Sequence, residues 1–380
     1  MTEGRVLVLN AGSATLKATV LDLPSTHPRS NRTVEWSSGT SAESVGETVG
    51  EVIATLADEG IDAASLAAVG HRVVHGGERF TEPTPIDDDV LAGLDAIVDL
   101  APIHQPLAIA TIRAAREHLP DAPHVAAFDT AFHATLPEAG RRYPIPDDWA
   151  RDHGVRRFGF HGLSVEWSVR RAAEMVGRPV EDVGLVVAHL GGGCSVTAVD
   201  RGRSVHTSMG MTPLDGLMMG TRAGSIDPGI IFRLIRRGLV ADDIERALEH
   251  DSGLVGVGGT DDMRQLLARE GAGEPRATLA VELFVRSAAG GIAAAATTLD
   301  ALDALIFTGG IGENGATVRS RICAALGTLG VPSPGPADDE RDLVLAGGAE
   351  GVAVIVVHAR EDLVIAEAAL EAARRQRRPN

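Results

Sequence analysis

The sequence has few cysteines, no long apolar run and a deficit of positive charge. Its two cysteines, Cys194 and Cys323, lack the paired spacing of a zinc site or a disulfide framework. No apolar stretch approaches the ~20 residues that a membrane-spanning helix needs. A strand-like run follows Met1 almost at once and leaves no room for a signal peptide. We therefore expect a cytoplasmic protein with no membrane partner.

The charge balance bears on the class of partner. The formal net charge is −17 at pH 7. Because a nucleic-acid-binding protein needs a basic face that displaces counterions, this balance argues against nucleic acid as a partner. The negative field also disfavours anionic substrates at long range. Any phosphate site must therefore be built locally from Arg, Lys and backbone N–H groups.

The length and the pattern of apolar residues indicate the fold class. At 380 residues the chain is too long for one compact core, which predicts two domains. Short apolar runs alternate with Ala-rich helical stretches, notably 280–299 and 363–374, and this alternation is typical of an α/β architecture. A strand, a polar glycine-bearing turn and a second strand occur at 5–23 and again at 185–199, which suggests a duplicated unit.

Three glycine-rich loops each follow a strand-like run, at 10–13, 189–193 and 309–312. Such turns expose backbone N–H groups to phosphate oxygens, and the chain has neither a Walker motif nor a Rossmann fingerprint. In the first loop and the strand after it, polar residues alternate and most should share one face. That row suits a hydrated Mg²⁺ and phosphate oxygens, although a solvated strand face would show the same pattern. The row comprises Asn10, Ser13, Thr15 and Lys17.

Two arginines stand where anion binding is expected. Arg72 lies within a strand-like apolar run and Arg222 lies in a loop of small residues. A guanidinium in such a place needs an anionic partner, either a substrate carboxylate or phosphate or a structural ion pair. Asp129 ends a strand, where catalytic carboxylates often sit, and His161 is flanked by aromatic residues and glycines.

Taken in order, these motifs resemble those of the acetate kinase family, the acetate and propionate kinases. The resemblance runs from Val6 to about Ala366. The motifs that carry it are Asn10–Ser13 with Leu16-Lys17, Gly70–Gly77, Phe128–His133, Gly159–Gly162, Met219–Arg222, Ser225–Pro228 and Phe307–Asn314.

The resemblance implies a fold and an activity. The family belongs to the sugar-kinase, actin and heat-shock ATPase superfamily, which implies a two-domain, duplicated ribonuclease-H-like α/β fold with an interdomain cleft. Domain I would comprise 1–131 plus 363–380, and domain II, at 132–362, would bind nucleotide and form a homodimer. The implied reaction is reversible phosphoryl transfer from ATP to acetate, giving acetyl phosphate and ADP, with Mg²⁺ or Mn²⁺ as cofactor. Propionate or another short-chain carboxylate is the alternative acceptor.

The resemblance also implies residue roles. Arg72 and Arg222 would clamp anions, His161 and Arg222 would stabilise the phosphoryl group in flight, and Asp129 would act near the attacking carboxylate or the metal. Asn10 and Glu361 would hold the metal. The acyl pocket would be walled by Val74, Ile103, Phe160 and Pro213. The phosphate and nucleotide contacts would come from Ser13, Thr15, Lys17, His189, Gly191, Gly192, Gly193, Asp262, Met263, Arg264, Gly309, Gly310, Ile311, Gly312 and Asn314.

Several positions depart from the family pattern, and those that bear on the rate include Gln105, Val165, Gly192 and Arg360. The preferred acid, the metabolic direction, the preferred phosphoryl donor and the partner of Asp129 stay open at this point. A sugar or glycerol kinase is one alternative, but it would need a general base for a neutral hydroxyl and hydrogen-bonding groups around a polyol. A module that binds acetyl phosphate or nucleotide without turnover, or with weak catalysis, is the other.

Overall fold

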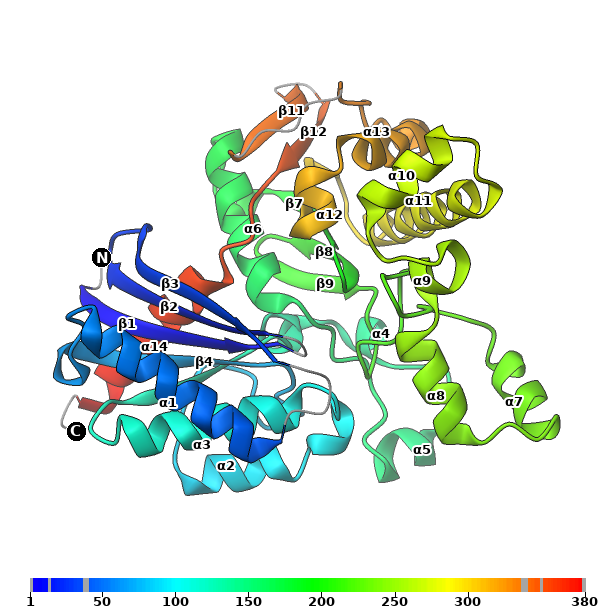
Figure 1. Cartoon of the computed structure of the whole chain (residues 1–380). Helices are drawn as coiled ribbons and strands as arrows, with labels where there is room; N and C mark the ends of the chain where they lie inside the picture. The colour runs from blue at the N-terminus through cyan, green and yellow to red at the C-terminus, as the bar shows by residue number, and fades with distance from the viewer. Residues whose placement is uncertain (1–2, 13–14, 37–40, 336–340, 349–350, 378–380) are drawn as a thin grey trace. The chain divides into compact units, whose positions relative to one another are not determined.

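The computed structural model describes residues 3–12, 15–36, 41–335, 341–348 and 351–377, and the chain divides into two compact units. Unit 1 comprises residues 1–134 and 360–380, and unit 2 comprises 135–359. Each junction lies three residues from the predicted boundary, so that 132–134 and 360–362 fall within unit 1. Figure 1 shows the two units with most of their helices and strands labelled.

Unit 1 is built on one six-stranded sheet in the order β3-β2-β1-β4-β6-β5. The first three strands form an antiparallel meander, β4 and β6 extend it in parallel, and β5 closes the edge antiparallel to β6. The predicted first hairpin is confirmed by the pairing of β1 with β2. The strands are β1 (Gly4–Ala11), β2 (Thr15–Leu23), β3 (Pro28–Glu35), β4 (Leu66–Val73), β5 (Thr84–Pro85) and β6 (His124–Phe128).

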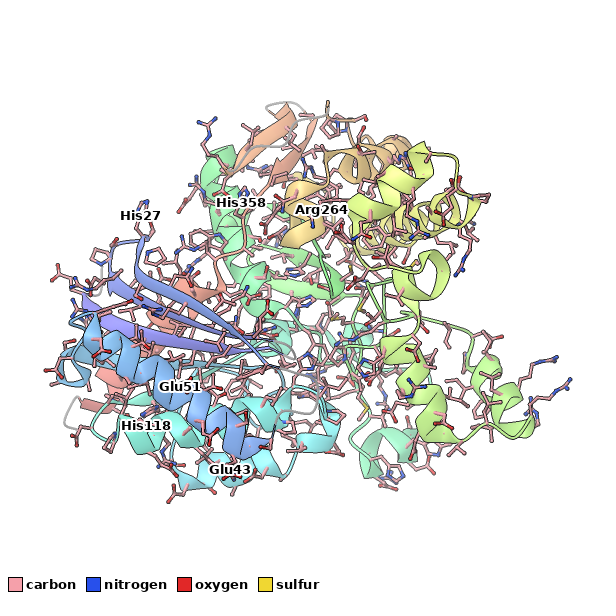
Figure 2. All side chains as sticks on the ribbon, viewed as in Figure 1. His27, Glu43, Glu51, His118, Arg264 and His358 are labelled. Carbon is pink, nitrogen blue, oxygen red and sulfur yellow. The ribbon has the colours of Figure 1, made fainter. Side chains whose placement is uncertain are left out.

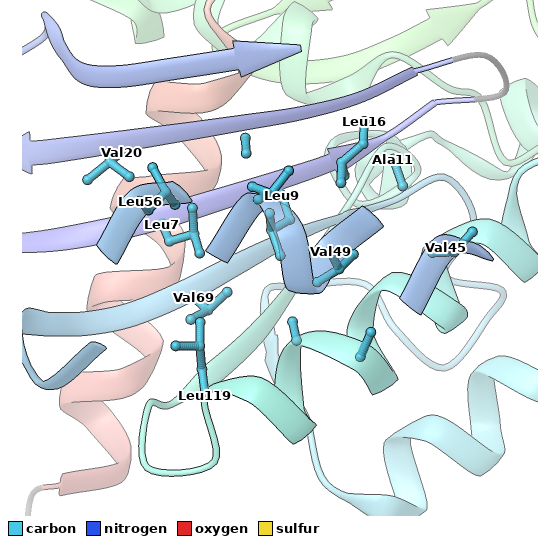
Figure 3. Close-up of a cluster of buried hydrophobic side chains, with 14 of the residues drawn as sticks. Leu7, Leu9, Ala11, Leu16, Val20, Val45, Val49, Leu56, Val69 and Leu119 are labelled. Carbon is cyan, nitrogen blue, oxygen red and sulfur yellow. The ribbon is translucent and has the colours of Figure 1, made fainter. Parts of the chain in front are cut away.

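Helices cover both faces of this sheet. On one face, α1 (Ala42–Asp58) and α3 (Gln105–His118) bury an apolar cluster with alternate strand residues such as Leu7 and Leu9 (Figure 3). The helical period explains the fit, because the buried residues of α1 recur every three or four positions. On the other face, α14 (Glu361–Arg377) lies so close to β4 that a Cβ at Gly70 would be 2.6 Å from Ile365 Cγ2. The remaining helix is α2 (Asp88–Asp95), with 3₁₀ turns at Ala63–Ser65, Val98–Leu100 and Ala131–Thr135.

Unit 2 repeats the same topology. Its sheet has the order β11-β12-β10-β7-β8-β9, again with three meandering strands, two parallel strands and an antiparallel edge. The predicted duplication and the α/β fold class are therefore confirmed. The strands are β7 (Gly184–Leu190), β8 (Cys194–Asp200), β9 (Arg203–Thr207), β10 (Ala304–Thr308), β11 (Leu343–Gly348) and β12 (Gly351–Val356).

The helices of unit 2 are more numerous. The helix α6 (Gly162–Val176) packs on β7 and β10, and α11 (Pro275–Ala296) packs on β7 and β8. The others are α4 (Glu138–Arg141), α5 (Asp147–Asp152), α7 (Pro228–Arg236), α8 (Ala241–His250), α9 (Gly253–Gly258), α10 (Met263–Gly271), α12 (Gly309–Asn314) and α13 (Ala316–Ala325), with 3₁₀ turns at Val180–Asp182 and Gly327–Leu329.

The helix α11 corrects one prediction. This 22-residue helix is long and apolar enough, by length and composition, to cross a membrane, although no apolar run of that length was predicted. No continuous apolar run marks this helix in the sequence, because Arg276, Glu282 and Arg286 interrupt it. A core helix satisfies the same criterion, and α11 packs against β7, β8, α9 and α10 within unit 2.

Candidate active site

Four polar side chains from four elements meet in unit 1, and we call Asn10, Arg72, Asp129 and Glu361 the carboxylate–arginine cluster. Arg72 donates two hydrogen bonds to Asp129, from Nε to Oδ1 at 3.0 Å and from Nη2 to Oδ2 at 2.6 Å. Its Nη1 donates to Asn10 Oδ1 at 3.2 Å. Asn10 Nδ2 in turn donates to Glu361 Oε2 at 3.3 Å, and that oxygen lies 3.9 Å from Arg72 Nε. The cluster is thus a continuous hydrogen-bonded chain.

Strand register brings these residues together. Leu9 on β1 pairs with His71 on β4, which sets Asn10 beside Arg72. Asp129 directly follows β6, and its backbone N–H donates to the carbonyl of Val73 at 3.0 Å. Glu361 is the first residue of α14, the helix that packs on this face of the sheet. Asn10 and Glu361, which were both predicted to hold the metal, therefore lie next to each other, and Arg72 and Asp129 join them.

The electrostatics of the cluster follow from burial and charge. Burial by itself would lower the pKa of Arg72, but the carboxylates of Asp129 and Glu361 outweigh it and raise that pKa, so the guanidinium stays charged. Burial raises the pKa of Asp129, Arg72 opposes the rise, and the charge of Glu361 adds to it. Two carboxyl groups thus face one guanidinium. This excess of carboxyl oxygens suits the binding of an additional cation.

The donor set fits a hard divalent ion. Mg²⁺ prefers oxygen ligands and is often bound through one or two carboxylates together with substrate phosphates and water. Asn10 Oδ1 and the Glu361 carboxylate supply such oxygens, with Asp129 next to them. In the described ranges, no group of three or more His, Cys, Asp or Glu side chains forms a complete metal cage. The residues therefore fit a metal that shares its coordination with a substrate.

The first glycine loop joins the cluster to the hairpin. Asn10 pairs with Lys17 in the β1–β2 register, and Thr15 lies two residues before Lys17, so all three share one face of the sheet. The Lys17 side chain is exposed and Thr15 is half-buried. Ser13 lies outside the described residues. The predicted polar face is therefore present in the part of the hairpin that the structure describes.

The predicted acyl-pocket residues fall on both units. Val74 is buried and Ile103 is half-buried in unit 1, whereas Phe160 is buried and Pro213 is half-buried in unit 2. One residue that departs from the family pattern, Gln105, connects the segments that carry Val74 and Ile103. Gln105, at the start of α3, donates from Nε2 to the carbonyl of His75 at 3.0 Å and so ties the segment after Ile103 to the segment after Val74.

In unit 2 two histidines stack. The rings of His161 and His189 lie 4.1 Å apart between centroids with a 20° angle between their planes. Each Nδ1 contacts a buried serine hydroxyl, Ser195 Oγ at 3.0 Å for His161 and Ser164 Oγ at 2.9 Å for His189. His161 has a φ of 59°, which is uncommon for a residue other than glycine and concentrates at functional sites. We call these two residues the stacked histidine pair.

The second glycine loop lies against this pair. A Cβ at Gly193 would be 3.1 Å from His161 Nε2 and 3.9 Å from Arg222 Nη1, so both side chains converge on the same glycine. The loop is braced by hydrogen bonds from Gly191 N to Gly193 O at 3.0 Å and from Gly220 N to Gly192 O at 3.2 Å. A Cβ at Gly192 would meet nothing within 4 Å. The departure at Gly192 therefore leaves open space, and the hydrogen bonds of the loop backbone remain.

Arg222 has the environment of an anion-binding side chain. Within the described part of the chain, its guanidinium lies within 4 Å of no carboxylate, and burial lowers its pKa while Glu249 only partly offsets the fall. A half-buried guanidinium without a carboxylate partner favours binding of an anion. The neighbouring thiol of Cys194 is buried and its pKa is raised to about 12, so it stays protonated and structural.

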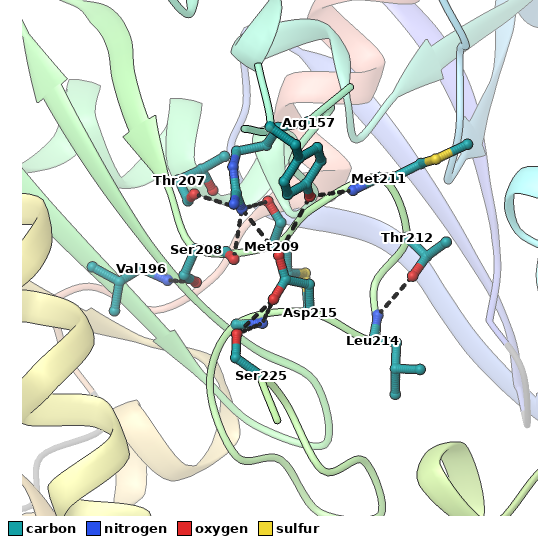
Figure 4. Close-up of polar contacts among 12 residues, drawn as sticks. Arg157, Val196, Thr207, Ser208, Met209, Met211, Thr212, Leu214, Asp215 and Ser225 are labelled. Carbon is teal, nitrogen blue, oxygen red and sulfur yellow. Dashed lines mark hydrogen bonds and ion pairs between the residues drawn. The ribbon is translucent and has the colours of Figure 1, made fainter. Parts of the chain in front are cut away.

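A polar network around Arg157 holds the two segments that carry these groups (Figure 4). Arg157 Nη1 donates to the carbonyls of Thr207, Ser208 and Met209 at 3.2, 2.9 and 2.8 Å. It also lies 3.4 Å from Asp215 Oδ2, and the other oxygen of Asp215 accepts from Ser225 Oγ at 2.5 Å. Arg157 thus links the segment before His161 to the loop that carries Arg222.

The backbone of the third glycine loop is held by the side chains of Glu313 and Arg319. Gly309 N donates to Glu313 Oε1 at 2.9 Å, and Arg319 Nη1 donates to the carbonyls of Gly312 and Glu313 at 2.8 and 2.7 Å. Asn314 Nδ2 folds back on the carbonyl of Gly310 at 2.9 Å. The remaining predicted residues of this loop lie on α12, namely Gly310, Ile311 and Gly312.

The residues predicted to bind the nucleotide near α10, namely Asp262, Met263 and Arg264, lie at the start of that helix. Asp262 caps the helix by accepting from Arg264 N at 2.9 Å, and Met263 is buried. The Arg264 side chain is 89% exposed (labelled in Figure 2), and its guanidinium holds the pKa of Asp262 down to about 2. The departures at Val165 and Arg360 have structural places: Val165 is buried in α6, and Arg360 pairs with Asp362.

Several residues of these sites were missed by sequence reasoning. The sequence places each serine near a histidine, since the predicted second hairpin pairs Ser195 with His189 and Ser164 follows His161 by three residues. The hydrogen bonds, however, join Ser195 to His161 and Ser164 to His189, and these partners could not be read from the sequence. Arg157, Glu313 and Arg319 act on backbone groups of irregular loops, for which the sequence has no periodic signal.

Comparison with known proteins places these features in a family. The model of the Acetokinase family matches residues 5–367. An acetate kinase from Deinococcus deserti is 45% identical over 385 residues, covering 95% of this chain and 96% of the relative. The crystal structure of Porphyromonas gingivalis acetate kinase is 32% identical with a TM-score of 0.87, covering 97% of this chain and 99% of that one. A propionate kinase from Francisella tularensis is also 32% identical, with a TM-score of 0.85 and coverage of 97% and 99%.

The family match spans nearly the whole chain, and the relatives are covered almost end to end. The two sheets with duplicated topology are those of the two-domain acetate kinase fold. The chain therefore belongs to the Acetokinase family, whose enzymes phosphorylate acetate with ATP.

Proposed function

We propose that the protein catalyses reversible, Mg²⁺-dependent phosphoryl transfer between ATP and acetate, with Mn²⁺ as a substitute metal and acetyl phosphate and ADP as products. The observation that carries this proposal is the carboxylate–arginine cluster, a half-buried guanidinium that lies between two carboxyl groups. It suits the combination of a carboxylate substrate and a metal-bound phosphate.

The chemistry needs charge control more than proton transfer. The attacking acetate oxygen is already an anion, so no strong general base is required. The barrier lies in bringing two anions together, which fixed cations and a divalent metal lower by electrostatic stabilisation. Arg72 would orient one anion and Arg222 with His161 would bind the phosphoryl group during an in-line transfer.

In this scheme Asn10 and Glu361 would hold the metal, which neutralises phosphate charge when it is bound. The hairpin residues Thr15 and Lys17, together with Ser13, would contact phosphate oxygens. In unit 2 the nucleotide would lie along the loop at 189–193, the start of α10 and α12. Domain II would in this way supply the nucleotide side of the reaction.

Asp129 has two candidate roles that kinetics separates. Its bidentate bond to Arg72 supports a role in orienting the acetate-binding guanidinium, and its neighbour Glu361 supports a role beside the metal. If Asp129 acts through Arg72, Asp129→Asn raises KM for acetate and leaves the Mg²⁺ concentration for half-maximal rate unchanged. If it acts at the metal, the Mg²⁺ requirement rises instead.

The test of the activity uses the purified protein with acetate, ATP, Mg²⁺ and hydroxylamine, which traps acetyl phosphate as acetyl hydroxamate. We expect hydroxamate to form, to stop with EDTA and to resume with added Mg²⁺. Absence of product with every acid from formate to butyrate would contradict the proposal. The same assay with acetate, propionate and butyrate decides the acid, since a propionate kinase is also among the similar structures.

We also propose that the protein is a cytoplasmic homodimer formed through unit 2. Its α7 buries no residue within the chain, and apolar side chains stay exposed on it and just after it, including Phe232 at 58% and Val240 at 60%. Figure 1 shows α7 at the outer edge of unit 2. An exposed apolar surface of this kind favours a self-complementary contact with a second copy. The other exposed members are Ile230, Ile235 and Leu239.

Light scattering tests the dimer. We expect twice the chain mass for the wild type and a shift to the monomer for Phe232→Glu combined with Ile235→Glu. A monomeric wild type at micromolar concentration would refute the homodimer. An unchanged dimer in the double variant would remove α7 from the interface.

A further inference from the structure

The stacked histidine pair is held by two serine hydroxyls in the same way. Ser195 lies on β8 and Ser164 on α6, and neither side chain is exposed to solvent. Each hydroxyl contacts an Nδ1 atom, and each Nε2 atom lies on the opposite side of its ring. This repetition suggests that the hydroxyls set a property that the two rings share.

That property is the position of the ring proton. A neutral imidazole carries its proton on one nitrogen, and the bond made by the other nitrogen decides which one. Neither hydroxyl makes a second hydrogen bond within the ranges that the structure describes. If Nδ1 carried the proton, each serine would accept and its own O–H would be buried without an acceptor, which is costly. Donation from the hydroxyl to Nδ1 avoids that cost and leaves the ring proton on Nε2.

The two Nε2 atoms lie at glycines of the two loops. A Cβ at Gly193 would be 3.1 Å from His161 Nε2, and a Cβ at Gly309 would be 3.1 Å from His189 Nε2. Each donor atom is therefore next to backbone that carries no side chain. His161 Nε2 also shares Gly193 with the guanidinium of Arg222, so a cationic donor converges on the same place as the ring nitrogen.

We propose that Ser195 and Ser164 are positioning residues that fix His161 and His189 as neutral Nε2–H tautomers, so that both rings present N–H donors to the phosphoryl oxygens. The inference rests on the proposed function for its kinetic consequence, but the tautomers themselves belong to the resting protein. Ser195 acts through His161, the ring beside Arg222, and should matter more for the rate. Ser164 acts through His189.

The direct test is nuclear magnetic resonance of full-length protein with ¹⁵N-labelled histidine. Long-range ¹H–¹⁵N spectra distinguish a protonated ring nitrogen from an unprotonated one, and the signals are assigned with His161→Asn and His189→Asn variants. We expect unprotonated Nδ1 and protonated Nε2 in both rings. Protonated Nδ1 in either ring would overturn the proposal, whether or not the protein is an active kinase.

The kinetic test uses three serine variants. Ser195→Ala should lower kcat about 10- to 100-fold, as expected for a misoriented hydrogen-bonding group, with KM for ATP and acetate changed less than about threefold. It should also shift His161 toward a mixture of tautomers. Ser195→Thr keeps a hydroxyl and should restore both kcat and the spectrum.

Ser168→Ala is the matched control, because Ser168 is equally buried on α6 and its hydroxyl makes no hydrogen bond in the described structure. It should leave kcat and both tautomers unchanged. A change of tautomer without a change of kcat in Ser195→Ala, or the reverse, would contradict the positioning role. If Ser195→Ala fails to fold, the wild-type spectrum and Ser195→Thr still decide. If the wild type makes no hydroxamate, the proposed function fails while the spectrum still tests the tautomers.

Discussion

A buried pair of histidines makes the stability of unit 1 depend on pH. His71 Nε2 and His124 Nδ1 are 2.9 Å apart, and His124 Nε2 lies 3.0 Å from the carbonyl of Leu119. The carbonyl can only accept, so His124 donates to it and His71 donates to His124. Burial lowers the pKa of His71 well below its usual range, and the neighbouring ring adds to the effect. Burial also lowers the pKa of His124, partly opposed by its bond to Leu119.

The sign and the size of this pH dependence follow from the difference between the folded and unfolded pKa values. Both groups have a lower pKa folded than unfolded, so the full stability is present above the unfolded value of about 6.5 and is lost as pH falls below it. At pH 5.5 the unfolded state gains about 1.4 kcal/mol from protonating each histidine, if the folded pKa values lie lower still. The pair therefore costs unit 1 up to about 2.8 kcal/mol between pH 7.5 and 5.5.

Tryptophan fluorescence can measure the unfolding of unit 1 separately. Trp36 is buried in the core of unit 1, whereas Trp149 and Trp167 belong to unit 2, so replacing those two by Phe makes fluorescence report on unit 1 alone. Urea unfolding would be followed from pH 7.5 to 5.5. We expect the fall in unfolding free energy to be smaller by up to about 2.8 kcal/mol when His71 and His124 are both replaced by Gln.

The matched control replaces two exposed histidines of the same unit, His27 and His118, by Gln (both labelled in Figure 2). It should keep the pH dependence of the parent protein. The reasoning would be refuted by a His71→Gln/His124→Gln variant whose stability falls as steeply with acid as that of the parent.

Three further outcomes are expected. Arg157→Met should lower the free energy of unfolding of unit 2 by about 3–6 kcal/mol, since two N–H protons serve three carbonyls, whereas Arg151→Met at the surface should change it by less than about 0.5 kcal/mol in calorimetry. Gly309→Ala should weaken ATP binding in titration calorimetry, because φ is +76° and the new Cβ would be 2.9 Å from Leu190 O. Gly330→Ala is the control, since its φ is +74° and its Cβ would meet open space, so it carries only the backbone strain of about 1–2 kcal/mol. Val74→Ala should raise the propionate-to-acetate ratio of kcat/KM, and an unchanged ratio would remove Val74 from the pocket.

The regular part of the fold was readable from the sequence, because apolar runs interrupted by glycine loops define strands by a simple period. The second hairpin is an example, and its register even contains the pairing of Ser195 with His189. The duplication became certain only when the strand orders of the two sheets could be compared, since the repeated motif is short.

The carboxylate–arginine cluster was predicted in its membership but not in its bonding. Motifs pointed to Arg72 and Asp129 separately, whereas their bidentate contact depends on β4 and β6 being neighbours. The network of Arg157 was missed altogether. Its acceptors are backbone carbonyls at the end of β9 and in the loop that follows. The sequence pattern of side chains does not predict where backbone carbonyls of a loop come together.

The return of α14 to the first sheet has a consequence for synthesis. Unit 1 begins with the earliest residues to leave the ribosome, but the helix that covers one face of its sheet, and that carries Glu361, is translated after the whole of unit 2. At ordinary elongation rates this delay is roughly 10 to 45 s. During that interval one side of the nascent sheet has no cover, and a premature stop anywhere before α14 would leave it exposed permanently. Release of a finished chain is thus the event that completes the half of the enzyme made first.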